Sequence, residues 1–340
     1  MAITIRDVSK YCGLSISAVS KALNNYPDVS EETRQRVLAA AHKIGYHPNA
    51  LARGLKTRRT YNLGVILVDE LGDNLQHTYF ITILNGFRRE AERQGYDITL
   101  VNHNIGGKQL SYLDHCRYRN MDGVCLMCVD FYDVEILKLA ESDMPVVTID
   151  HLFQGRECVL SDNQSGMESI LNYVTGMGHH RIAFIHGTRS TVTDERLTAF
   201  HTTLSKLGVQ VPCEYVIPSH YHSTSYAKED TRRLMTLPEP PSCILMVDDY
   251  SALGGIDTIQ HLGLRIPDDI SIDGYDGISL IQKMHPRLTT VRQDGEEIGR
   301  LAAIRLMERI ETPQTPVPEP KVVPCELIIG ETVQRVIPNG

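Results

Sequence analysis

From Tyr61 onward, short apolar runs typical of buried strands alternate with amphipathic segments typical of helices. The predicted strands form two series, residues 62–68, 96–102, 123–129 and 145–149, then 181–186, 243–247 and 270–273. The helices between them are residues 78–94, 134–142, 164–175, 195–207, 223–237 and 250–262. A helix at 294–310, in which Gly299 permits close approach of a neighbour, and a last strand at 321–329 follow. Apolar strands separated by helices indicate parallel sheets covered on both faces, so we predict an α/β fold with two Rossmann-like subdomains.

Polar residues recur where these strands end. The acids are Asp69, Asp150, Asp248, Asp249 and Asp276, and Arg196 lies near the start of the helix after the strand at 181–186. Each acid alone is more often a helix cap or a surface residue. Because parallel sheets bind ligands at the carboxyl ends of their strands, the recurrence predicts a polar cleft at that edge.

The first 25 residues carry a different pattern, two short helices around a tight turn. The first helix is predicted over residues 5–12 with Gly13 as its C-cap, and Ser15 or Ser17 caps a second helix that ends near residue 23. The apolar set that packs them together is Val8, Leu14, Val19 and Leu23. The exposed start of the second helix presents Ser15, Ile16, Ser17 and Lys21. In a helix-turn-helix these positions meet base edges in the major groove, although any αα-hairpin has similar spacing.

A third helix at 31–44, capped by Ser30 and ended by Gly45, completes an all-α unit. Its predicted apolar face is Val37, Leu38, Ala41 and Ile44. Residues 1–60 hold ten Lys and Arg against four Asp and Glu, a net charge of +6, whereas the remainder carries 24 basic and 38 acidic residues. A basic head suits contact with phosphates, and an acidic body is repelled by them.

Two segments, TIRDVSKYCGLSISAVSKALNN and VSEETRQRVLAAAHKIGYHPNALARGL, resemble the lactose-repressor (LacI/GalR) family of bacterial transcription regulators. The resemblance continues in order along the whole chain. It implies a helix-turn-helix headpiece at 1–46, a hinge helix at 47–60 and an effector domain of the periplasmic-binding-protein type I fold at 61–340. The chain would cross between two subdomains near residues 162, 288 and 322. One subdomain would hold 61–161 and 289–321, and the other 162–288 and 322–340.

The resemblance also implies which residues contact DNA. The hinge helices of a dimer would enter the minor groove and wedge Leu55 between base steps, which costs unstacking energy and gains a bent, more closely contacted duplex. Ile16 offers an apolar contact, for example to a thymine methyl group. The expected DNA-contacting residues are Thr4, Ser15, Ile16, Ser17, Lys21, Asn24, Ser30, Asn49, Ala52 and Leu55.

The family's effector cleft matches the residues at the strand ends. Its arginine corresponds to Arg196, its aspartate to Asp276, and its Asn-Asp pair to Asp248-Asp249. At Asp248 a carboxylate, which only accepts hydrogen bonds, therefore replaces an amide, which also donates them. An aromatic stacking position falls on His220 or Tyr221. The expected effector-binding residues are Asp69, Tyr79, Phe80, Asp150, Arg196, His220, Tyr221, Asp248 and Asp276. Such a set suits a sugar. A purine or a small phosphorylated ligand is the alternative, and the excess of acids disfavours a strongly anionic one.

Enzyme and metal sites lack their usual motifs in this sequence. It has no Walker-type phosphate loop, no G-x-G-x-x-G after a strand, no G-x-S-x-G and no H-E-x-x-H. Cys125 and Cys128 form a C-x-x-C inside a predicted buried strand, where residues three apart point to opposite faces. His179-His180 and the pair His220 and His222 lack a third ligand at suitable spacing. We therefore expect no enzymatic activity, no metal and no cofactor.

No apolar run reaches the roughly 20 residues that span a bilayer, and the polar first residues do not resemble a secretory signal. The scattered cysteines are expected to be free thiols in a reducing cytosol. We predict a cytoplasmic, homodimeric repressor that binds a pseudo-palindromic DNA operator under the control of a small molecule. A regulator that needs a corepressor, or one controlled by a protein partner, is the alternative. A secreted sugar-binding protein would share the body's fold but would not carry the basic head.

Overall fold

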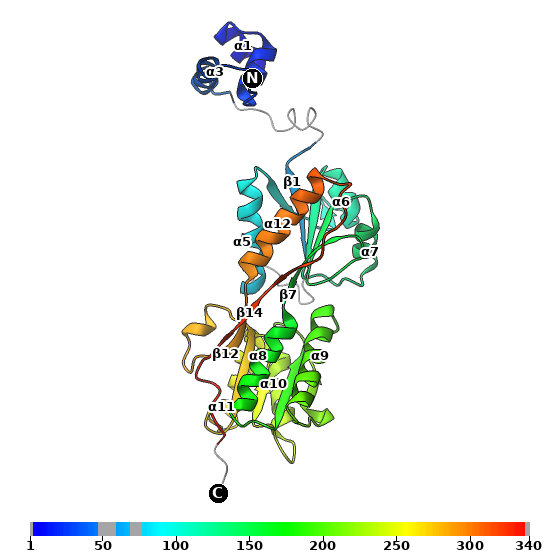
Figure 1. Cartoon of the computed structure of the whole chain (residues 1–340), viewed down its shortest axis with the longest axis vertical. Helices are drawn as coiled ribbons and strands as arrows, with labels where there is room; N and C mark the ends of the chain where they lie inside the picture. The colour runs from blue at the N-terminus through cyan, green and yellow to red at the C-terminus, as the bar shows by residue number, and fades with distance from the viewer. Residues whose placement is uncertain (1–2, 47–58, 69–76, 337–340) are drawn as a thin grey trace. The chain divides into compact units, whose positions relative to one another are not determined.

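The computed structural model describes residues 3–46, 59–68 and 77–336, and the chain divides into two compact units, Met1–Tyr61 and Asn62–Gly340 (Figure 1). Residues 47–58 of the predicted hinge, with Asn49, Ala52 and Leu55, lie outside the described residues, as does Asp69. None of the described helices combines the length and the apolar character that crossing a membrane requires.

The first unit contains three helices, α1 (Ile5–Cys12), α2 (Ile16–Leu23) and α3 (Glu31–Ile44). Gly13 follows α1 with a left-handed backbone, and Ser15 Oγ accepts a hydrogen bond from Ala18 N at 3.1 Å, so Ser15 rather than Ser17 caps α2. The three helices pack through the buried side chains of Val8, Cys12, Val19, Ala22, Val37, Ala40 and Ala41. The prediction that Leu38 belongs to this core was wrong. Its side chain is 43% exposed, because Val37 and the two alanines already form the inward face of α3.

The second unit contains two six-stranded sheets with helices packed on them (Figure 1). Every neighbouring pair in the first sheet is parallel. In spatial order its strands are β13 (Lys321–Val323), β7 (Glu157–Ser161), β6 (Val146–Ile149), β5 (Gly123–Met127), β1 (Asn62–Leu67) and β2 (Asp97–Leu100). Its helices are α5 (Thr78–Arg93), α6 (Tyr112–Tyr118), α7 (Val134–Glu141) and α12 (Gly295–Glu311), and β3 (Asn104–Ile105) and β4 (Lys108–Gln109) form a small hairpin. We call this part the first lobe.

The second lobe is built on the other sheet, in which only the pair of β14 and β12 is antiparallel. In spatial order its strands are β14 (Cys325–Ile328), β12 (Thr289–Gln293), β11 (Ser271–Asp276), β10 (Cys243–Leu245), β8 (Ile182–His186) and β9 (Val216–Pro218). Its helices are α8 (Asn163–Gly176), α9 (Thr191–Lys206), α10 (Thr224–Met235) and α11 (Asp249–His261), with 3-10 turns at Cys213–Tyr215 and Ile281–Lys283. The alternation of strands and helices confirms the predicted α/β class.

The chain passes between the lobes three times. It crosses between β7 and α8, between β12 and α12, and between β13 and β14. The second crossing follows Gln293 rather than residue 288, because β12 pairs in the second sheet. The single strand predicted at 321–329 is two strands in different sheets, separated by Pro324, which has no N–H to continue a ladder.

Helices α5 and α12 cover the first sheet and lie side by side (Figure 1). A Cβ atom on Gly299 would stand 1.9 Å from the carbonyl oxygen of Ile83, and one on Gly86 would stand 2.0 Å from that of Glu296. Both glycines are therefore required for this close packing, as the sequence predicted for Gly299.

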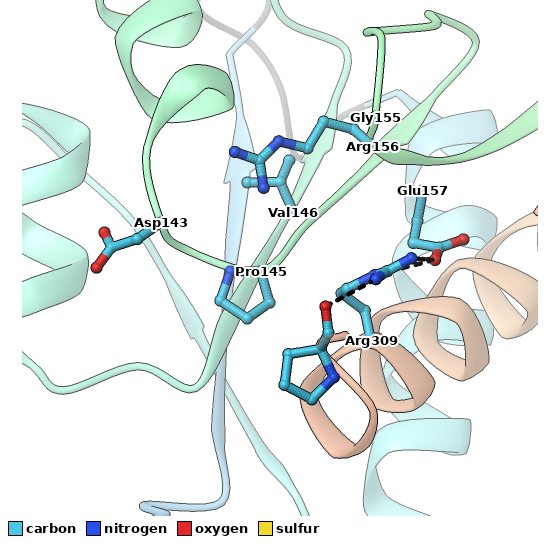
Figure 2. Close-up of a pocket in the computed structure, with 8 residues that line it drawn as sticks. Asp143, Pro145, Val146, Gly155, Arg156, Glu157 and Arg309 are labelled. Carbon is cyan, nitrogen blue, oxygen red and sulfur yellow. Dashed lines mark hydrogen bonds and ion pairs between the residues drawn. The ribbon is translucent and has the colours of Figure 1, made fainter. Parts of the chain in front are cut away.

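A buried ion-pair group attaches α12 to β7 (Figure 2). The Glu157 carboxylate is 2.7 Å from Arg309 Nη2 and 3.6 Å from Arg305 Nη1. Nearby, Arg156 Nε donates to Ala140 O at 2.6 Å and its Nη1 donates to Met144 O at 3.0 Å. A charged strand residue is thus stabilised by partners about 150 positions further along the chain.

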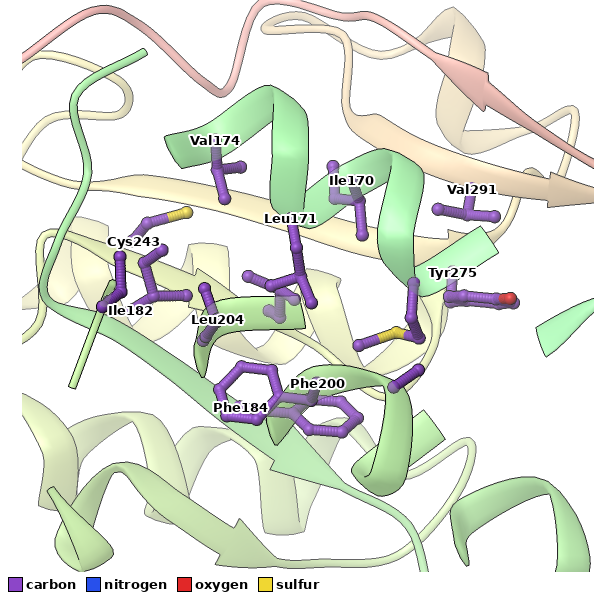
Figure 3. Close-up of a cluster of buried hydrophobic side chains, with 14 of the residues drawn as sticks. Ile170, Leu171, Val174, Ile182, Phe184, Phe200, Leu204, Cys243, Tyr275 and Val291 are labelled. Carbon is purple, nitrogen blue, oxygen red and sulfur yellow. The ribbon is translucent and has the colours of Figure 1, made fainter. Parts of the chain in front are cut away.

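The core of the second lobe lies between α8, α9 and the sheet (Figure 3). Phe184 on β8 and Phe200 on α9 are in contact, with ring centroids 5.2 Å apart. Leu171 and Val174 of α8 pack onto the same cluster, so this face of the helix is buried. This rigid base holds the strand ends that carry the polar residues described next.

Candidate functional site

Three carboxylates lie where strands end, in both lobes. Asp150 follows β6 of the first lobe, Asp276 is the last residue of β11 in the second lobe, and Asp248 follows β10 as the N-cap of α11. Parallel sheets present side chains to a ligand at such positions.

Arg196 lies in α9 and is only 4% exposed. Its Nε donates to Asn163 Oδ1 at 2.9 Å, and its Nη1 donates to Val247 O at 3.2 Å. The guanidinium carbon lies 3.5 Å from the centroid of the Tyr275 ring. A planar cation is therefore held in one orientation, stacked on a ring, and can donate to a ligand oxygen.

Asp248 is buried and bonded to the protein through both oxygens. Oδ1 accepts from Ser251 N at 2.7 Å and Oδ2 accepts from His222 N at 2.7 Å, while His222 Nδ1 is 3.3 Å from Oδ2. Burial alone would raise the pKa of Asp248, but His222 and these hydrogen bonds hold it well below the usual range. The carboxylate predicted to contact the effector is thus an ionised helix cap that positions His222.

Asp276 differs from Asp248 in its charge state. Oδ1 accepts from Gln293 Nε2 at 2.7 Å, and Oδ2 has no hydrogen-bond partner among the described residues. Burial and the charge of Asp248 raise the pKa of Asp276 to about 7. Near neutral pH this carboxyl group therefore exists in both protonation states, and it can either donate to a hydroxyl or accept from one.

In the first lobe, Asp150 is paired with Ser161 at the end of β7. Oδ1 accepts from Ser161 N at 2.6 Å, and Oδ2 accepts from Ser161 Oγ at 3.1 Å. The Tyr79 hydroxyl lies 3.5 Å from the same Ser161 oxygen, which places the predicted residue Tyr79 beside Asp150. The two strand ends and the first turn of α5 thus form one polar wall.

A group of rings closes the other side of this region. The His77 ring lies 3.6 Å from His222, 4.8 Å from Phe80 and 4.9 Å from Tyr250, measured between centroids. His77 and Phe80 belong to the first lobe, and His222 and Tyr250 to the second. Burial and the neighbouring His222 lower the pKa of His77 to about 3, so its imidazole is neutral at neutral pH. The lobes therefore meet through aromatic faces.

The aromatic position left open between His220 and Tyr221 falls on Tyr221. Its hydroxyl lies 2.8 Å from Thr193 Oγ1, and its electrostatic interaction with Arg196 partly offsets the increase in pKa that burial causes. His220 instead stacks on Tyr226 at 4.2 Å and lines a separate open pocket of about 370 Å³ beside β8 and α9. Tyr221 thus belongs to the group around Arg196, and His220 does not.

In the first unit, several predicted DNA-contacting residues also serve as helix caps. Thr4 donates to Asp7 Oδ2 from N at 2.8 Å and from Oγ1 at 2.7 Å, Ser15 caps α2 and Ser30 caps α3. Asn24 Nδ2 donates to Ser20 O at 2.7 Å. The exposed first turn of α2 consists of Ile16, which is 44% exposed, and Ser17, and the Lys21 ammonium is paired with Asp28. This surface is polar and basic around one exposed apolar side chain.

Comparison with known proteins finds a match in each of the two units. Residues 4–49 match the family of bacterial regulatory proteins, lacI family, and residues 171–333 match a periplasmic binding protein-like domain. The HTH-type transcriptional repressor PurR of Photobacterium profundum is 31% identical over 320 residues, which cover 91% of this chain and 92% of that protein. The chain belongs to the LacI family. This LacI-family protein is a DNA-binding transcriptional repressor, as its relative PurR is named.

Two solved structures share the fold of this LacI-family chain. The lac repressor dimer bound to operator and the anti-inducer ONPF has a TM-score of 0.81 at 22% identity, and the match covers 98% of this chain and 100% of that one. The complex of the transcriptional regulator CelR with cellobiose has a TM-score of 0.71 at 23% identity, covering 97% and 99%.

The structure adds residues that the sequence did not assign to the effector site of this LacI-family repressor. Ser161 and Asn163 hold Asp150 and Arg196 in place, and His77, His222 and Tyr250 form most of the ring group. The position of His77, immediately before a predicted helix that already contained Tyr79 and Phe80, was the one available signal. The others come together only through the folding of both lobes.

Proposed function

We propose that the effector is a neutral polyhydroxylated molecule, most simply a sugar, bound between the two lobes. The observation that carries this proposal is the convergence of Arg196, Asp150 and Asp276 at the strand ends. A fixed guanidinium donates to hydroxyl oxygens, Asp150 accepts, and Asp276 does either. The adjoining rings suit the apolar face of a pyranose. The cellobiose complex of CelR, which has the same fold, is consistent with this ligand class.

The first unit supplies the operator contacts in this proposal. Ile16 and Ser17 meet base edges, Lys21 and the capped helix starts meet phosphates, and two copies of the chain bind a pseudo-palindromic operator in the bacterial cytoplasm. The lac repressor, which has the same fold, is a dimer in its operator complex. The domain boundaries, the hinge at 47–60 and its wedge residue Leu55 belong to this proposal as well.

Effector binding changes the angle between the lobes and so lowers operator affinity. Because the two sites are thermodynamically coupled, the operator lowers effector affinity by the same factor. A molecule that instead raises operator affinity would be a corepressor. Operator binding measured with and without the molecule distinguishes an inducer from a corepressor.

A thermal-shift screen of the purified chain against sugars, sugar phosphates, nucleobases and amino acids tests the ligand class. A ligand at 100 times its dissociation constant adds about 2.7 kcal/mol to stability and raises the melting temperature. We expect hits among neutral sugars, and Arg196→Lys should weaken them at least about tenfold because the planar fork is lost. The matched control is Arg181→Lys, since Arg181 Nε donates to Pro240 O at an exposed site. Hits confined to phosphorylated compounds or nucleobases would contradict the proposal.

A further inference from the structure

Three side chains where the two lobes meet place polar atoms close to one another. His77 comes directly before α5 in the first lobe, His222 lies between β9 and α10, and Asp276 ends β11. One ligand-type atom from each lies within 4.8 Å of both others, and His77 Nε2 is 3.9 Å from Asp276 Oδ2. That separation is too long for a hydrogen bond, so hydrogen bonding does not explain the arrangement.

We propose that His77, His222 and Asp276 form a binding site for a divalent transition metal ion of the zinc type. Two imidazoles and one carboxylate are a ligand set that such ions accept, with metal–ligand distances of about 2.0–2.2 Å. A tetrahedral ion at those distances holds its ligand atoms about 3.4 Å apart. Small side-chain rotations therefore suffice to form the site from the observed positions.

Two of the three ligands are buried with unsatisfied atoms. His77 is 4% exposed and Asp276 is 6% exposed. Neither ring nitrogen of His77, nor Oδ2 of Asp276, has a hydrogen-bond partner within the part of the chain that the structure describes. Buried polar atoms normally have partners, and an ion shared by these atoms would satisfy them together.

The surroundings orient the ligands as metal sites usually do. The Asp248 carboxylate lies 3.3 Å from Nδ1 of His222 and accepts a hydrogen bond from the backbone N of the same residue at 2.7 Å, which fixes the position of His222. Gln293 Nε2 donates to Oδ1 of Asp276 at 2.7 Å, which leaves Oδ2 for the ion. Each of these partners thus positions a ligand.

The ion would join the lobes, because His77 belongs to the first lobe and the other two ligands to the second. Three protein ligands leave at least one position of a tetrahedral ion for an oxygen atom of water or of the effector. The metal site itself is inferred from the ligand residues alone. Only the binding of an effector oxygen to the ion rests on the proposed effector function.

The test is metal binding by the full chain after removal of metal with a chelator. Equilibrium dialysis against zinc chloride, with elemental analysis, should give about one ion per chain in the wild type. His77→Ala and Asp276→Asn should each weaken zinc binding at least tenfold, whereas His261→Ala, which removes a histidine that is 74% exposed, should not. Cobalt in the same site should give the strong visible bands of four-coordinate ions. The melting temperatures of the metal-free variants show whether each one is folded.

Sub-stoichiometric zinc in the wild type, or unchanged affinity in folded His77→Ala and Asp276→Asn, would overturn the metal site. The sugar screen repeated with a chelator and then with zinc separates this result from the effector proposal. A sugar that binds metal-free protein with no zinc uptake supports the effector and rejects the metal. Zinc uptake without any sugar hit supports the metal and rejects the sugar.

Discussion

Asp248 joins two elements through one carboxylate, since Oδ1 caps α11 and Oδ2 holds the backbone N–H of His222. Asp248 is 1% exposed, so no water can replace its carboxylate as the acceptor for the N–H groups of Ser251 and His222. An asparagine at this position can keep the cap through its oxygen, but its NH2 group cannot accept from His222 N, and the charge that faces the His222 ring is lost. The carboxylate therefore stabilises the approach of the loop before α10 to the start of α11.

Asp248→Ala should lower the free energy of unfolding by about 2–4 kcal/mol, because a helix cap is lost and a buried N–H is left without a partner. Asp248→Asn should cost less than Asp248→Ala, because the cap is retained while the bond to His222 N is lost. Urea unfolding of both variants measures the difference, and equal losses would show that the cap contributes little.

Ile16 is the exposed apolar residue on the first turn of α2. Ile16→Ala should weaken operator binding by about 1–2 kcal/mol, roughly 5- to 30-fold, because its apolar contact area is lost. Leu38→Ala is the matched control, since Leu38 is 43% exposed on α3. Fluorescence anisotropy with labelled operator measures both variants. Equal effects would remove Ile16 from the base-contacting set.

Lys21 is paired with Asp28 in the free protein, and that pair competes with phosphate for the ammonium. Asp28→Asn frees Lys21 and removes one negative charge from the basic unit. We expect DNA affinity to increase about 2- to 5-fold at low salt and the gain to shrink as salt is added. A gain that does not depend on salt would contradict this account.

At the scale of elements, α5 and α12 show how much a single small residue decides. Gly299 allows the two helices to approach until only a hydrogen atom fits against the carbonyl of Ile83. By contrast, a Cβ atom on Gly176 of α8 would meet nothing within 4 Å. The two glycines are both helical, and only one of them is required by packing.

Gly299→Ala should therefore destabilise the chain by about 1–3 kcal/mol through overpacking, while Gly176→Ala should stabilise it by about 0.5–1 kcal/mol through reduced backbone entropy of the unfolded state. Thermal unfolding of the two variants beside the wild type measures both signs. Similar behaviour of the two would contradict the close packing of α5 and α12.

The elements that sequence reasoning found and missed differ in a physical way. Strands β1, β5 and β8 are apolar over four or more consecutive residues and were predicted. Strands β7 and β12 were not predicted, since β7 contains Glu157 and β12 contains Arg292. Glu157 is compatible with a buried strand only because Arg305 and Arg309 approach it from α12. Asp150 and Asp276 could be predicted as site residues because each lies at the end of a strand. The contact of His77 with His222 could not be predicted, because it forms only when both lobes are folded.

At the scale of the whole molecule, buried histidines link stability to pH. His179 is 3% exposed, with Nδ1 2.9 Å from Ser242 Oγ and Nε2 3.1 Å from Gln334 O. Burial, with His180 nearby, lowers the pKa of His179 below its ordinary 6.5. The folded state therefore disfavours the protonated form, while the unfolded chain takes up that proton below about pH 6.5.

The free energy of unfolding should consequently be highest well above pH 6.5 and should decrease through His179 as the pH falls from 7.5 to 5.5. His179→Gln should flatten this pH slope, whatever its effect on stability at pH 7.5. His261→Gln, at a position 74% exposed, should leave the slope unchanged. Urea unfolding at both pH values provides the comparison, and an unchanged slope in His179→Gln would contradict the assignment.

Each lobe is assembled from separate stretches of chain, because the backbone passes between the sheets after β7, after β12 and after β13. A truncation cannot isolate the first lobe: a fragment that stops at Ser161 lacks both α12 and β13. A single proteolytic cut at one crossing leaves two peptide connections intact, so the lobes stay tethered. Three tethers restrict twisting of one lobe against the other more than a single tether would, so the lobes behave as a connected pair.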